Sequence, residues 1–160
     1  MSRLALCTIA LLVGCVPLGP GGPDAAPGCP AIGCGPALQI DFQRPGAWLP
    51  GTYRVEVAAD GLTNACEVMI PMSCDHPPRC QGDPTWLPLL EGCALDPSLQ
   101  KISGVVFDRT TPASVTVTVS MNDRSLGTRT FTPTYRTNTP TPGCSLTCTQ
   151  APGEVLTLAQ

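Results

Sequence analysis

Ten cysteines and one histidine are the most reactive side chains of this 160-residue chain. Four of them lie close together and have the side-chain types that zinc prefers, thiolate and imidazole: Cys74, His76, Cys80 and Cys93. Their spacing matches no standard zinc finger, and an oxidising compartment converts thiols to disulfides. The pattern therefore predicts disulfides in this region, with no metal and no cofactor.

Cys15 ends an apolar segment that begins just after Arg3. Residues 4–13 form a run of ten, well short of the roughly 20 apolar residues that a transmembrane helix needs. One basic residue followed by a short apolar run is typical of a secretory leader. The last four residues of this segment, Leu-Val-Gly-Cys at positions 12–15, resemble the lipobox of bacterial lipoproteins.

The resemblance implies that the leader is removed and that Cys15 becomes the acylated first residue. Three acyl chains such as palmitate would anchor it stably, because each buried methylene contributes about 0.8 kcal/mol. Val16 stands where an Asp favours inner-membrane retention in some bacteria, so the outer membrane is favoured. An ordinary cleaved signal peptide and a buried N-terminal helix remain the alternatives.

Cysteine parity agrees with this interpretation. Cys7 is lost with the leader and Cys15 is taken by lipid, which leaves an even number for four disulfides in an exported chain. We expect a local Cys29–Cys34 bridge, one or two bridges pinning the loop between Cys74 and Cys93, and a clasp from Cys144 or Cys148. The eight candidates are Cys29, Cys34, Cys66, Cys74, Cys80, Cys93, Cys144 and Cys148.

Composition limits the partners. The net charge is −3, and removal of Arg3 with the leader leaves eight basic and twelve acidic residues, a charge of −4. A mildly acidic chain without a basic cluster is a poor candidate for binding nucleic acid. The expected partners are the membrane, through the lipid anchor, and an envelope protein or glycan.

The chain divides into three parts. Residues 1–14 are the predicted leader, and residues 15–36 are the lipidated cysteine and a spacer rich in proline and glycine. Such a spacer extends by about 3.1 Å per residue, or roughly 65 Å in all. Residues 37–160 are the predicted domain, which has few aromatic residues for a core.

Alternation of apolar and polar residues predicts strands in this domain. Residues 52–59 and 65–71, joined by Asp60-Gly61, form one expected hairpin, and residues 114–121 and 124–132 form another around Asn122-Asp123. Leu126 and Phe131 are five apart and so fall on opposite faces of a regular strand, which a bulge at Gly127 would correct.

Further strands are expected at residues 101–108 and 154–158, with a short strand or helical turn at 85–90. The segments 71–97 and 133–152 are predicted to be proline-rich loops. Six or seven strands predict an all-β fold, a small antiparallel β-sandwich stapled by disulfides. The pattern of strands and turns in residues 37–135 resembles that of immunoglobulin-like or transthyretin-like domains.

No catalytic motif stands out. His76 lacks the Gly-x-Ser-x-Gly elbow of a hydrolase triad, so a catalytic role is disfavoured. Trp48 and Trp86 are candidates for binding a sugar or a protein. A role in the core is favoured for both, because aromatic residues are scarce in this chain. Arg79 is a candidate for orienting an acidic ligand. The favoured function is a non-catalytic binding or structural module; the alternative is a hydrolase using acidic residues of the 71–97 loop.

Overall fold

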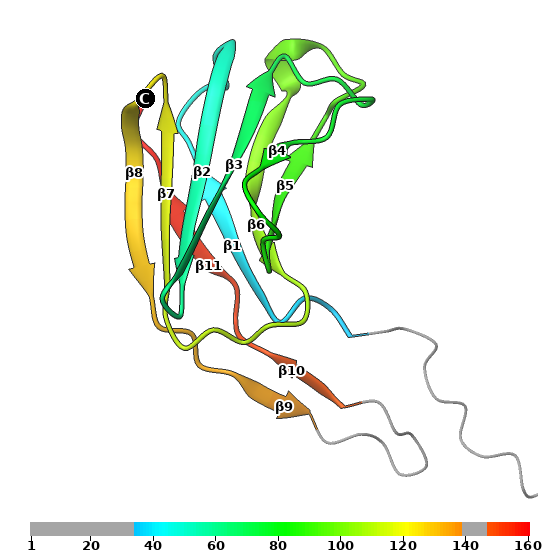
Figure 1. Cartoon of the computed structure of the whole chain (residues 1–160). Coiled ribbons are helices and arrows are strands. Elements are labelled where there is room, and N and C mark those ends of the chain that lie inside the picture. The colour runs from blue at the N-terminus through cyan, green and yellow to red at the C-terminus, as the bar shows by residue number, and fades with distance from the viewer. Residues whose placement is uncertain (1–33, 139–146) are drawn as a thin grey trace, which may run out of the picture.

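The computed structural model describes residues 34–138 and 147–160, so the predicted leader, Cys15 and most of the spacer lie outside it. The described chain forms two packed β-sheets and a small two-stranded ribbon (Figure 1). It contains no α-helix, and no described helix is long and apolar enough to cross a membrane. The prediction of an all-β, sandwich-like domain is confirmed.

The four-stranded sheet has the order β11-β1-β6-β5 and the five-stranded sheet the order β4-β3-β2-β7-β8. The first consists of β1 (Leu38–Gln43), β5 (Leu87–Glu91), β6 (Lys101–Phe107) and β11 (Glu154–Thr157). The second consists of β2 (Gly51–Ala59), β3 (Leu62–Ile70), β4 (Arg79–Cys80), β7 (Val115–Met121) and β8 (Arg124–Phe131). The ribbon pairs β9 (Arg136–Asn138) with β10 (Cys148–Gln150), and a short 3₁₀ helix spans Pro97–Leu99.

Both predicted hairpins are present. In β7, Val115, Val117 and Val119 are fully buried, while the threonines between them face outward and bond to threonines of β8. Asn122 and Asp123 have φ values of 49° and 65°, as a tight turn between these strands requires. β2 and β3 pair antiparallel along nine residues, from Gly51↔Ile70 to Ala59↔Leu62.

The predicted bulge is present in this strand, at Leu126 rather than at Gly127. Val119 pairs with Gly127, but Ser120 pairs with Ser125, so Leu126 is the extra residue of β8. This insertion turns both Leu126 and Phe131 into the core, where they are 7% and 3% exposed. The inconsistency in the alternation of this strand therefore has a structural cause.

The fold differs from the expectation in three respects. The described residues form eleven strands rather than six or seven, since β1 was not among the expected strands and β4, β9 and β10 are short strands in segments predicted as loops. Residues 85–90, left open between strand and helical turn, contribute to β5. The last strand, β11, pairs with β1 in parallel rather than antiparallel register, from Ile40↔Glu154 to Gln43↔Thr157.

Three disulfides cross-link the described chain. Cys74–Cys93 pins the predicted loop, and Cys148 supplies the predicted clasp. The clasp joins Cys34, so the expected Cys29–Cys34 bridge is wrong. The third bridge, Cys66–Cys80, connects β3 to β4.

The error over Cys34 has a simple spatial reason. Ala37 accepts a 2.8 Å hydrogen bond from the backbone of Ala151, so the chain entering β1 runs beside the end of β10. Cys148 is therefore close to Cys34 in space, although the two are far apart in the sequence. Cys29 and Cys144 lie outside the described residues.

The two lateral edges of the sandwich are held differently. On the closed side, β11 and its continuation lie against β8: Ala159 donates to Leu126 O at 2.7 Å and Arg129 Nη1 donates to Val155 O at 2.9 Å. On the open side, β4 and β5 are the edge strands of the two sheets. There the loops at residues 71–78 and 92–97 are joined by the Cys74–Cys93 bridge.

Candidate functional site

The residues predicted as candidates for binding fall in three different places. Trp86 is 2% exposed and Trp48 is 7% exposed, so both are core residues, the role favoured for them. Trp48 also lines a hollow at one end of the sandwich, whereas His76 and Arg79 line a groove on the open side. The structure thus does not gather these residues into one site.

The groove on the open side, called here the side groove, has a volume of about 740 Å³. It lies between β3 and the loop that follows it, and Leu90 of β5 closes it from the other sheet. Its surface is mainly apolar, and Met69 beside it is 64% exposed. The lining residues are Thr52, Glu67, Val68, Met69, Pro71, Met72, Ser73, His76, Pro77, Pro78, Arg79 and Leu90.

His76 belongs to a tight turn in this groove. Its Nδ1 lies 3.1 Å from Ser73 Oγ, and its backbone N–H donates to Ser73 O at 3.3 Å. Ser73 Oγ also accepts from the Asp75 N–H at 3.3 Å, as in a serine-stabilised turn. These contacts explain the local conformation, whereas a catalytic pair also needs a third group that orients the base.

The acidic residues of the 71–97 loop do not converge. None of the four lines the side groove: Asp75, Asp83, Glu91 and Asp96. Hydrogen bonds from Lys101 and Ser103 lower the pKa of Glu91, and hydrogen bonds from Ser98 lower the pKa of Asp96. A general acid needs a raised pKa, so neither Glu91 nor Asp96 fits that role.

The same segment shows what the cysteines beside His76 do. Cys74 and Cys93 are bonded to each other, and Cys80 is bonded to Cys66. A sulfur atom in a disulfide cannot bind zinc as thiolate. The prediction of disulfides in place of a zinc site is confirmed for these cysteines.

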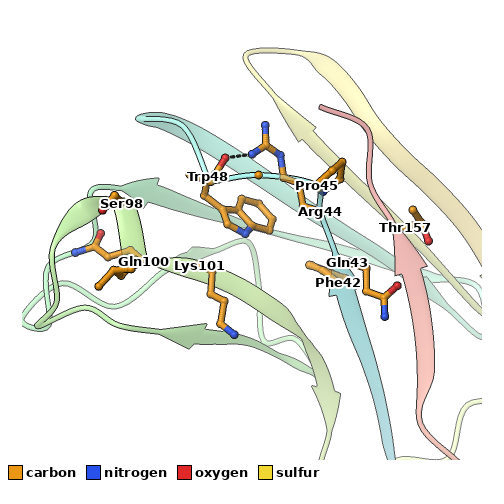
Figure 2. A pocket seen from close by; sticks show the side chains of 12 residues that line it. Phe42, Gln43, Arg44, Pro45, Trp48, Ser98, Gln100, Lys101 and Thr157 are labelled. Carbon is orange, nitrogen blue, oxygen red and sulfur yellow. Dashed lines mark hydrogen bonds between the residues drawn. The ribbon is translucent and has the colours of Figure 1, made fainter.

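The hollow at the end of the sandwich, called here the end hollow, has a volume of about 750 Å³ and lies where β1 and β11 end and β6 begins. Figure 2 shows the Trp48 ring above Lys101, with Phe42 and Gln43 to its right. The lining residues are Phe42, Gln43, Arg44, Pro45, Gly46, Ala47, Trp48, Ser98, Leu99, Gln100, Lys101 and Thr157.

Packing against a second aromatic ring fixes Trp48 at the end hollow. The rings of Trp48 and Tyr53 meet edge to face with centroids 4.9 Å apart, and the Tyr53 hydroxyl donates to Leu49 O at 2.9 Å. Burial raises the pKa of Tyr53, so its hydroxyl stays protonated and keeps this bond. The loop between β1 and β2 is thereby fixed to the core.

Arg44 also lines the end hollow and lies against the Trp48 ring. Its guanidinium carbon lies 5.6 Å from the centre of the Trp48 ring, and its Nη1 donates to the carbonyl of Ala47 (Figure 2). Its Nε is buried and has no hydrogen-bond partner among the described residues. Sequence reasoning missed Arg44, although its position four residues before a tryptophan in a Pro-Gly loop was visible.

Gln100 was also missed. It is 3% exposed, and its amide is bonded to both loops that the Cys74–Cys93 bridge joins. Nε2 lies 3.4 Å from Met72 O, 3.4 Å from Cys93 O and 3.3 Å from Leu95 O, while Oε1 accepts from the Met72 N–H at 2.5 Å. Its role is structural, since it satisfies buried backbone groups behind the end hollow.

Comparisons with known proteins add no family. No protein-family model matches the chain, and searches of curated proteins and of solved structures find no match. The resemblances to bacterial lipoproteins and to immunoglobulin-like or transthyretin-like domains therefore rest on the sequence patterns alone.

Proposed function

We propose that this chain is a lipoprotein of the bacterial cell envelope, anchored through Cys15, preferentially in the outer membrane. Its disulfide-stapled sandwich acts as a non-catalytic module that binds or scaffolds an envelope protein or glycan. The pairing of all six described cysteines is the observation that carries this proposal. Disulfides persist in exported proteins, and the leader ending at Cys15 would export this one.

The attachment of Cys34 to the domain is compatible with a tether before it. Cys34 is cross-linked to Cys148 at the start of β10, and β1 follows four residues later. The 18 residues from 16 to 33 would span at most about 56 Å as an extended spacer. This length allows the domain to stand clear of lipid headgroups while remaining attached.

The non-catalytic part of the proposal rests on the two hollows. The side groove contains one carboxylate, Glu67, and the end hollow contains none. Paired carboxylates of glycosidase type need two such groups facing each other. The described surface instead offers apolar and cationic recognition surfaces, which suit binding.

Acylation is tested by labelling the full-length protein with an alkyne analogue of palmitate in bacteria. The wild type should incorporate the label and fractionate with membranes, and Cys15→Ala should do neither. Cys7→Ala is the matched control, because it removes a thiol that the leader carries but that lipid does not use. An unlabelled wild type, or a labelled Cys15→Ala variant, would overturn the anchor.

A further inference from the structure

We infer that the end hollow binds a ligand with a free carboxylate next to an apolar group, such as the C-terminal end of a short peptide, with Arg44 as the carboxylate receptor. The inference deepens the proposed binding function by naming a ligand class. It depends on the described geometry of the hollow and not on acylation of Cys15.

Charge is the first argument. The chain is acidic overall, yet the end hollow is lined by two cations, Arg44 and Lys101, and by no acidic residue. Two carboxylates contact lining residues from outside: Glu91 pairs with Lys101 at 2.9 Å, and Asp96 accepts from Ser98 at 2.6 Å. Arg44 has no carboxylate partner among the described residues, so its charge is available to an anion.

The orientation of Arg44 is the second argument. The Trp48 ring lies against the guanidinium carbon, and the Ala47 carbonyl accepts a hydrogen bond from Nη1. The opposite edge, formed by Nε and Nη2, is the pair of donors that binds a carboxylate with two parallel hydrogen bonds. Nε is buried and has no partner among the described residues, so Nη2, which is neither buried nor recorded as bonded, is the donor on this edge that a ligand oxygen can reach.

The walls of the hollow give the third argument. Phe42, Pro45 and Leu99 are apolar lining residues, and Leu99 is 62% exposed. Gln43, Ser98 and Thr157 add polar side chains suited to backbone amides of a peptide. A volume of about 750 Å³ falls in the range of small-ligand sites.

The position of the hollow makes it accessible. β1 begins at Leu38, on the side of the chain that leads back to Cys15, whereas the hollow is lined by Phe42 and Gln43 at the other end of that strand. Six residues of strand separate the two points by about 20 Å. A ligand therefore approaches from the end that faces away from the attachment point.

The test is calorimetric titration of the full-length chain in detergent with acetylated dipeptides that differ in their C-terminal side chain. Each dipeptide is used as the free acid and as the C-terminal amide. We expect saturable binding of at least one acid and no binding of its amide. If no acid binds more tightly than its amide, the inference is wrong.

Four variants locate the carboxylate. Arg44→Gln should weaken binding of the acid by about tenfold or more, since it removes a charged hydrogen-bonding group. Lys101→Gln should weaken it by about twofold to fivefold, and Glu91→Gln, which frees Lys101, should tighten it by a similar factor. Arg54→Gln is the control, because Arg54 pairs with Glu56 on the five-stranded sheet away from the hollow.

The variants distinguish a specific receptor from the overall charge of the protein. Unchanged affinity in a folded Arg44→Gln variant would exclude Arg44 as the receptor. An equal loss of affinity in Arg54→Gln would show that overall charge, and not a contact with Arg44, attracts the acid. Thermal unfolding shows whether each variant is folded. Cys15→Ala should bind the acid like the wild type, so failure of the anchor and failure of the site are distinguishable.

Discussion

The closed and open sides of the sandwich hold the two sheets together in different ways. On the closed side, β11 brings the four-stranded sheet within hydrogen-bonding reach of β8, and no disulfide is recorded between them. On the open side, the edge strands β4 and β5 belong to different sheets and are not paired with each other. The bridge Cys74–Cys93 and the buried amide of Gln100 hold the loops there instead.

The difference shows where a chain with a small core needs covalent support. Hydrogen bonds join the two sheets where β11 and the residues after it lie beside β8. Where the edges diverge, loops cover the gap, and loops lose more conformational entropy than they recover by burial. On that side, the Cys74–Cys93 bridge and the hydrogen-bonded amide of Gln100 compensate for this entropy loss. The side groove lies beside the loops that they hold.

The largest effect is expected on removal of the cross-link of the open side. The double variant Cys74→Ala/Cys93→Ala should lower the free energy of unfolding by about 3 kcal/mol, because the bridge closes a loop of about 20 residues. Urea unfolding measures this loss. Hydrogen exchange should rise at β5 while β8 and β11 stay protected; equal rises on both sides would contradict the distinction.

Gln100→Leu should be the next most damaging change. It leaves the buried Met72 N–H without an acceptor, which costs about 2 kcal/mol. The exposed residue Gln81 provides the matched control, since Gln81→Leu should change stability by less than about 0.5 kcal/mol. Similar urea midpoints for the two variants would show that the buried amide does not support the open side.

The closed side should be sensitive to steric crowding rather than to loss of a bond. A Cβ added at Gly127 would lie 3.0 Å from Leu158 Cδ2 and 3.1 Å from Thr157 O. Gly127→Ala should therefore destabilise by about 1 kcal/mol through overpacking. Gly153→Ala, where the nearest atom to the added Cβ is Gln39 O at 4.0 Å, is the control and should be close to neutral. A neutral Gly127→Ala variant would mean that β8 and β11 are not packed closely.

The smallest effect should appear only at alkaline pH. Burial, and then the negative charge of Asp60, raise the pKa of Tyr135 from 10.0 to about 12. Its contribution to stability is therefore complete below pH 10, the unfolded value, and is lost as pH rises toward about 12. Urea midpoints measured from pH 9 upward should fall less steeply in Tyr135→Phe. Identical pH dependences in the two proteins would exclude this role for Tyr135.

Local patterns in the sequence predicted much of the fold. The β7–β8 hairpin and its bulge followed from alternation and from the spacing of Leu126 and Phe131, which are properties of one strand. The parallel pairing of β1 with β11 was not predictable in this way, because it joins residues more than 110 positions apart. The same distance explains the error over the partner of Cys34.

The sites were predicted less well than the strands. Trp48 and Trp86 were identified from their residue type, and their burial agrees with the favoured core role. Gln100 has no local signature, since its importance depends on backbone groups that only the folded chain brings to it. Arg44 has one, because it lies four residues before a loop tryptophan.

The most direct test of the account is the mass of the N-terminal peptide from the purified, non-reduced full-length protein. We predict a peptide that begins at Cys15 and carries a thioether-linked diacylglyceride with a further N-terminal acyl chain. A peptide that still begins at Met1, or one that begins near residue 15 without lipid, would contradict the proposal that this sandwich is tethered to the envelope.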